Sequence, residues 1–154
     1  MKKVKILWAI ALGLAYVVAL SFTSALIVDT TGEWYEGLAL PTYTPNKVLF
    51  SVIWGVIYCV FALTFAETFT KKIKKRVIIG YVFIAVFNLL FLLFFFRLHN
   101  LLVSFVFCLI STIVVLLHGF AMIKYGFRLS WLFLPVLVWY VFCFSISYYV
   151  IMNN

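Results

Sequence analysis

The most regular feature of the chain is a series of long apolar stretches separated by short polar segments. An α-helix needs about 20 mostly apolar residues to cross the hydrocarbon core of a bilayer, and each stretch reaches that length. A transmembrane β-strand is about half as long and alternates in polarity, which these stretches do not. The pattern therefore predicts an all-α integral membrane bundle, a single domain of five transmembrane helices over residues 4–28, 45–69, 77–96, 101–122 and 129–151.

The first stretch is preceded by Lys2, Lys3 and Lys5, as in a signal peptide. The apolar core of a signal peptide is only about 7–15 residues long and ends in a small-residue cleavage site. The stretch here is longer, so we interpret it as a retained helix.

Composition supports a membrane protein, because 68% of the 154 residues are apolar and only 10% are charged. A soluble domain is about half apolar and about a quarter charged. The net charge of +8 would raise nucleic acid as a partner of a soluble protein. Here the basic residues flank the apolar stretches, which indicates membrane topology and contact with the lipid bilayer, and no nucleic-acid partner is expected.

Basic residues gather on alternate connections. If the N-terminus is cytoplasmic, all but two of the 12 Lys and Arg residues lie on the cytoplasmic side. These are Lys2, Lys3, Lys5, Lys71, Lys72, Lys74, Lys75, Arg76, Lys124 and Arg128, which leaves Lys47 and Arg97 on the other side. The positive-inside rule thus predicts a multi-pass protein of the cell membrane whose C-terminus and first loop are extracytoplasmic.

The longest connection, residues 29–44, contains Trp34, Tyr35 and Pro41 and three of the four acidic residues. A long loop in a compact protein is commonly a functional lid or a disordered segment, and this aromatic composition favours an ordered lid. Thr44 and Pro45 are predicted to be the N-cap and first residue of the next helix.

Few residues offer metal or catalytic chemistry. Cys59, Cys108 and Cys143 each lie inside an apolar stretch, so we interpret them as packing residues. His99 and His118 are well separated, and no metal site is expected. No nucleophilic triad, phosphate loop or carboxylate pair is present, so the chain is not a conventional enzyme by motif.

The ionisable residues also argue against a proton-coupled pump, because none lies at the middle of a stretch. Glu67 is near a helix end, four residues before Lys71, and an ion pair between them is expected.

Aromatic residues recur at helical spacing on three predicted helices. The three stripes are Phe50, Trp54, Tyr58 and Phe61; Tyr81, Ile84, Asn88, Phe91 and Phe95; and Pro135, Trp139, Phe142 and Ile146. Trp54 and Trp139 are each about 14 Å from a helix end at 1.5 Å per residue, too deep for an interfacial belt. A buried indole N–H and a buried amide both need partners. The pattern fits either a self-satisfied core or a cavity for a flat aromatic ligand. Pro135 predicts a kink.

Two stripes of small residues could allow close helix contact. One is Ala11, Ala15 and Ala19, and the other is Ser104, Cys108 and Thr112. Spacing alone leaves contact within one bundle and contact between two copies equally open.

The order of these residues resembles the TspO/MBR family, which comprises bacterial tryptophan-rich sensory proteins and mitochondrial translocator proteins, also called peripheral benzodiazepine receptors. The match covers nearly the whole chain. It runs through Trp34, Tyr35, Glu36, Gly37, Leu38, Pro41, Pro45, Phe50, Trp54, Tyr58, Asn88, Phe95, Phe96, Pro135, Trp139 and Tyr148.

The resemblance implies a five-helix bundle, often a homodimer, that binds porphyrins and other tetrapyrroles as well as isoquinoline carboxamide and benzodiazepine-type drugs. Some bacterial members promote light-dependent oxidative degradation of protoporphyrin IX, so porphyrin would be ligand or substrate and no cofactor is required. The implied pocket lies beneath the first loop. With helical spacing added, its expected members are Trp34, Tyr35, Pro41, Pro45, Phe50, Trp54, Tyr58, Asn88, Phe91, Phe95, Trp139 and Phe142.

The chain also departs from the family pattern. Leu89, Leu90 and Phe91 follow Asn88 where tryptophans are common, and Ser147 replaces an asparagine. The sterol motif requires a basic residue after its tyrosine, and residues 150–154 supply none, so sterol binding is not expected.

Three functions fit these observations. The first is a tetrapyrrole-binding protein with photo-oxidative activity, in which Trp54, Trp139 and Trp34 are candidate redox indoles. The second is a passive carrier of amphipathic molecules, and the third is a sensory protein whose ligand alters a partner.

The charge distribution predicts the outcome of a topology experiment. A reporter enzyme that is active only in the cytoplasm should be silent when fused after Asn154, and active when fused in the 71–76 connection. Full activity of the C-terminal fusion would contradict the orientation.

Overall fold

The structure is a computed structural model that describes residues 2–70 and 75–154. Within these residues five helices are long and apolar enough to cross a membrane. They are α1 (Lys2–Ile27), α3 (Lys47–Thr70), α4 (Lys75–Phe96), α5 (Leu101–Lys124) and α6 (Phe133–Asn153). The described residues contain no strand, so the predicted all-α five-helix bundle is confirmed.

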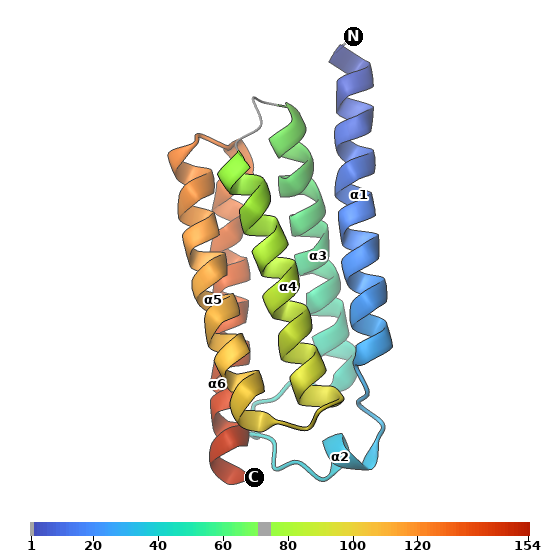
Figure 1. Cartoon of the computed structure of the whole chain (residues 1–154), viewed down its shortest axis with the longest axis vertical. Coiled ribbons are helices and arrows are strands. Elements are labelled where there is room, and N and C mark those ends of the chain that lie inside the picture. The colour runs from blue at the N-terminus through green and yellow to red at the C-terminus, as the bar shows by residue number, and fades with distance from the viewer. Residues whose placement is uncertain (1, 71–74) are drawn as a thin grey trace.

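The helices run up and down in one bundle, with the N-terminus and the C-terminus at opposite ends (Figure 1). Two short helices complete the chain. The helix α2 (Glu33–Glu36) lies in the first loop, and the 3-10 helix η1 (Arg128–Leu132) leads into α6.

Contacts between the long helices are uneven around the bundle. The closest pairs are α4 with α5, α1 with α3 and α5 with α6, while α1 touches α4 over a smaller area. The backbones of α3 and α6 approach each other less closely than those of these pairs. The most loosely packed seam of the bundle therefore lies between α3 and α6.

Glycines make two of the close contacts possible. A Cβ on Gly13 of α1 would collide with the carbonyl oxygen of Ala62 on α3, and one on Gly80 of α4 would collide with the imidazole of His118 on α5. Small residues at helix interfaces are the usual solution in membranes, because lipid is as apolar as the side chains and close packing supplies the attraction.

The observed helix boundaries correct two local predictions. The helix α3 begins at Lys47, and the Asn46 side chain accepts a hydrogen bond from the Leu49 N–H at 2.9 Å, so Asn46 acts as the cap in place of Thr44. Because η1 ends before Phe133, Pro135 falls in the first turn of α6. A proline needs no backbone donor there, which removes the reason for a kink.

Glu67 binds backbone groups at the start of η1, and the ion pair predicted for it with Lys71 stays a prediction. Its proposed partner Lys71 lies outside the described residues, as do Lys72 and Lys74. The Glu67 carboxylate accepts hydrogen bonds from the backbone N–H groups of Arg128 at 2.7 Å and Leu129 at 3.0 Å. It thereby satisfies free donors at the start of η1.

The two small-residue stripes lie in different environments. Ala11, Ala15 and Ala19 are exposed on the outer face of α1. Ser104 and Cys108 are buried inside the bundle on α5. Only the α1 stripe is therefore free to contact a second copy of the chain.

This difference separates two substitutions. Cys108→Leu adds volume to a filled interface and should lower the thermal midpoint, at a cost of about 1–3 kcal/mol. Ala15→Leu should leave that midpoint nearly unchanged and shift the protein toward monomer on a detergent sizing column, because close approach of two α1 helices needs small residues. An unchanged elution volume for Ala15→Leu would exclude this face as a dimer contact.

Candidate functional site

The aromatic side chains of α3 and α6 meet across the seam. The ring of Trp139 lies 5.3 Å from Phe50 and 6.5 Å from Trp54, measured between ring centroids. Phe142 stacks on the other side of Trp139 at 5.2 Å. Trp54 also meets Tyr140 edge-on at 5.6 Å. The two tryptophans that lie deep in the bundle are thus direct neighbours.

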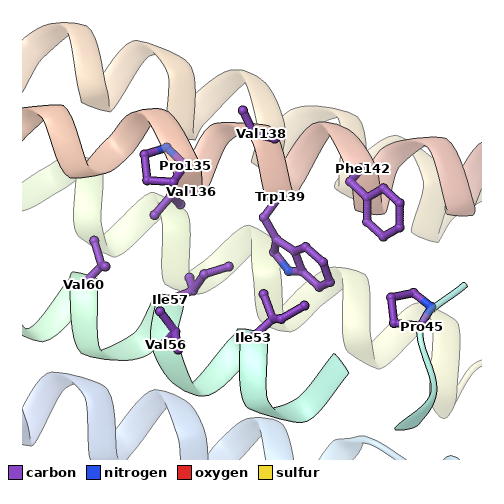
Figure 2. A pocket seen from close by; sticks show the side chains of 10 residues that line it. All are labelled: Pro45, Ile53, Val56, Ile57, Val60, Pro135, Val136, Val138, Trp139 and Phe142. Carbon is purple, nitrogen blue, oxygen red and sulfur yellow. The ribbon is translucent and has the colours of Figure 1, made fainter. Parts of the chain in front are cut away.

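An apolar groove of about 380 Å³ follows the seam beside this cluster. Figure 2 shows Trp139 reaching from α6 toward Ile53 and Ile57 on α3. The lining residues are Pro45, Ile53, Val56, Ile57, Val60, Pro135, Val136, Val138, Trp139 and Phe142. A volume of this size falls within the range of small-molecule sites, which are mostly apolar with a few fixed polar groups.

Trp139, which lines the groove, carries an unsatisfied polar atom. The indole Nε1 of Trp139 is buried and has no hydrogen-bond partner among the described residues. A buried donor without an acceptor costs about 1–3 kcal/mol. An acceptor on a bound molecule would remove that cost.

Polar side chains form a layer inside the aromatic cluster. Asn88 on α4 is buried and accepts a long hydrogen bond, 3.5 Å, from the Tyr140 hydroxyl. The hydroxyl groups of Tyr58 and Ser24 are 3.1 Å apart and share a hydrogen bond. The amide predicted from the α4 stripe is therefore engaged inside the protein, at the weak end of hydrogen-bond geometry.

The first loop is fastened to the end of α4. The indole Nε1 of Trp34 donates to the carbonyl oxygen of Phe95 at 3.0 Å, and its ring stacks on His99 at 4.4 Å. Tyr35 stacks on Phe96 at 5.8 Å. These contacts give the predicted loop an ordered structure over α4.

Charged groups support the same loop. The Asp29 carboxylate accepts hydrogen bonds from the N–H groups of Thr31 and Gly32, and these bonds lower the pKa of Asp29 below its usual value. Lys47 donates to the carbonyl oxygen of Thr30 and forms an exposed ion pair with Glu36 at 3.6 Å. These contacts hold the loop together and bind it to the start of α3.

Comparison with known proteins decides which family this architecture represents. The model of the TspO/MBR family matches residues 9–152, nearly the entire chain. The chain belongs to the TspO/MBR family. No individual curated protein matches it.

TspO/MBR membership, together with the five apolar helices, makes the chain a multi-pass membrane protein. It also supports a general role in binding tetrapyrroles and drug-type ligands. The resemblance predicted from the sequence is confirmed.

The structure distributes the twelve expected TspO/MBR pocket residues over three places. Pro45, Trp139 and Phe142 line the groove. Behind them are Phe50, Trp54, Tyr58 and Asn88, in contact with one another through rings or through Tyr140. Trp34, Tyr35 and Phe95 belong to the loop attachment, where Phe91 packs on Phe95 at 5.7 Å and Pro41 is buried.

This distribution bears on the candidate redox indoles. Trp139 lines the groove and Trp54 lies behind it in ring contact, whereas the Trp34 indole is bonded to Phe95 in the loop attachment. That any of these residues binds a ligand stays a prediction.

Sequence reasoning missed Tyr140 and the aliphatic walls of the groove. Tyr140 belongs to the buried stripe of α6, which comprises Phe133, Val136, Tyr140, Ser147 and Val150. The spacings of three, four and seven residues within this stripe could have revealed it. The polar residues Tyr140 and Ser147 mark it as the face that turns inward. The predicted stripe through Trp139 and Phe142 is the flank of the helix that faces the seam.

The loop attachment predicts a local change in stability. Trp34→Phe keeps a ring for stacking on His99 but removes the N–H donor to Phe95, a loss of about 1 kcal/mol. Amide exchange in residues 30–44 should become roughly fivefold faster, with little change elsewhere. Trp131→Phe, at an exposed tryptophan, is the matched control. Unchanged exchange in the Trp34 variant would show that other contacts hold the loop.

Proposed function

We propose that the protein binds tetrapyrroles such as protoporphyrin IX in the groove between α3 and α6 and promotes their light-dependent oxidative degradation. The observation that carries the proposal is the buried, unpartnered indole N–H of Trp139, next to a second deep indole. A flat, mostly apolar ring fits between apolar walls and stacks on Trp139 and Phe142.

Polar groups of the ligand have a place at the loop end of the seam. The carboxylates of protoporphyrin need water or cations, and Lys47 is an exposed cation where α3 begins. Isoquinoline carboxamide and benzodiazepine-type drugs carry a carbonyl oxygen, which would accept the Trp139 N–H in the same groove. Both ligand classes therefore suit one apolar site with one buried donor.

The indoles supply the chemistry in this proposal. A light-excited porphyrin takes one electron from a tryptophan in contact with it and passes that electron to dioxygen, which leaves superoxide and an indole radical cation. The radical cation then takes one electron from the ground-state porphyrin, and superoxide adds to the resulting porphyrin cation radical. One porphyrin and one dioxygen thus give an oxygenated porphyrin, and the indole is restored. Trp54 lies edge-on to Trp139 at 6.5 Å and can share the radical cation. The protein then contributes orientation and confinement, while the pigment carries the reactive states. We also propose a homodimer through the exposed face of α1.

Binding and photochemistry should separate by mutation. Trp139→Phe keeps a ring but loses the N–H donor and is a poorer electron donor. Porphyrin affinity, from an absorption titration in darkness, should fall about two- to tenfold. At saturating porphyrin, bleaching under light and air should be clearly slower than in the parent. Trp131→Phe should change neither quantity.

A double variant gives the decisive comparison. If Trp54→Phe with Trp139→Phe bleaches bound porphyrin at the parental rate, indole electron transfer is wrong and the protein is a binder or carrier. Asn88→Leu should weaken binding by about 1–2 kcal/mol through loss of the amide that holds Tyr140, with no effect on bleaching at saturation.

A further inference from the structure

Among the described residues, the hydrogen bonds that tie α3 to α6 through their flanking segments lie near the helix ends. At one end, Glu67 of α3 holds the backbone N–H groups of Arg128 and Leu129 in η1, which continues directly into α6. A carboxylate bound to two backbone donors is a strong tie, because charge-assisted hydrogen bonds exceed neutral ones.

The first loop closes the other end. The Tyr43 hydroxyl donates to the Ser145 carbonyl oxygen at 3.4 Å, and its ring meets Phe142 at 5.9 Å. The side chain of Asn154, just past α6, accepts from the Ala39 N–H at 2.8 Å and donates to the Ala39 carbonyl oxygen at 3.3 Å. The segment that leads into α3 is thereby bound to the last turns of α6.

Between these two ties only side chains fill the seam, and they form a lip and a floor. Val56 on α3 and Val138 on α6 are 59% and 63% exposed at the outer lip. Ile57 and Val136 are 4% and 1% exposed and form the floor. The Trp139 side chain extends from α6 into the space between the two helices, as Figure 2 shows. Among the described residues, no hydrogen bond joins α3 to α6 across this middle part.

The lip lies at a depth where the surroundings are hydrocarbon. Val56 is nine residues beyond the start of α3, about 14 Å along the helix at 1.5 Å per residue. A hydrocarbon core is about 30 Å thick, so the opening faces acyl chains near the middle of the bilayer. Separating the two lips costs little there, since lipid tails contact valine side chains about as well as other side chains do.

We propose that the seam is a lateral entrance through which a flat apolar ligand passes from the lipid into the groove, between the side chains of Val56 and Val138. The inference rests on the proposed ligand site and names its route of access. An apolar tetrapyrrole is concentrated in the bilayer, and this route leads it to Trp139 without opening the loop that Trp34 fastens to α4. Ligands that partition into lipid are therefore favoured over equally flat but water-soluble ones.

Kinetics of protoporphyrin binding in lipid nanodiscs test the entrance. Val56→Phe with Val138→Phe narrows the lip without touching the floor. Association and dissociation rates should both fall at least tenfold, because a barrier at the entrance slows passage in both directions. Val56→Ala with Val138→Ala should raise the association and dissociation rates. This second variant tests the entrance even if the larger side chains impair folding.

The chain offers matched controls one turn away. Val52 on α3 and Leu134 on α6 are similarly exposed but do not line the groove. Val52→Phe with Leu134→Phe should leave both rates unchanged. Association and dissociation rates equal to those of the parent in both lip variants would overturn the entrance. A slower association rate with an unchanged dissociation rate would also overturn it, since that pattern marks a contact of the bound ligand. Absence of binding by the parent protein would instead refute the ligand site itself.

Discussion

The lipid around the five helices offers no hydrogen-bond partners, and it provides no hydrophobic driving force for helices to associate. These two constraints shape the whole bundle. Helices form because each satisfies its own backbone. They associate where small residues allow close approach, as Gly13 does against Ala62 and Gly80 does against His118. The remaining specificity lies in a few polar ties, and the helix pair that lacks such ties along its middle is the pair that leaves a groove.

The same constraints explain why three of the polar ties lie at helix ends. Trp34 to Phe95, Asn154 to Ala39 and Glu67 to η1 all involve segments at or beyond helix ends, where backbone groups have no helical partner. Inside the span, Asn88 and Tyr140 satisfy each other only weakly, and Trp139 has no partner at all. Buried polar atoms without a partner among the described residues also occur on Tyr81, Ser111 and His118, and Trp139 is the member of this set that lines the groove, where a ligand can compensate for it.

The sequence allowed the five helices to be predicted, because the thickness of the bilayer fixes their length and apolar character. It did not show which face of α6 turns inward, since that helix is apolar all round and lipid removes the contrast between inside and outside. The predicted stripe through Trp139 lies on the seam, while Tyr140 and Ser147 face the interior. Trp34 was expected at the pocket, and its attachment 61 residues along the chain depends on tertiary contacts that local spacing does not encode.

The uneven packing divides the chain into two consecutive halves. The pair α1–α3 forms one antiparallel unit, the trio α4–α5–α6 forms another, and narrower contacts join the two. Each unit can assemble from neighbours in sequence as it leaves the ribosome, so the meeting of the two halves is the last step. A molecule that contacts both α3 and α6 would hold these halves together, and it would act as a folding chaperone for the newly made protein as well as its ligand.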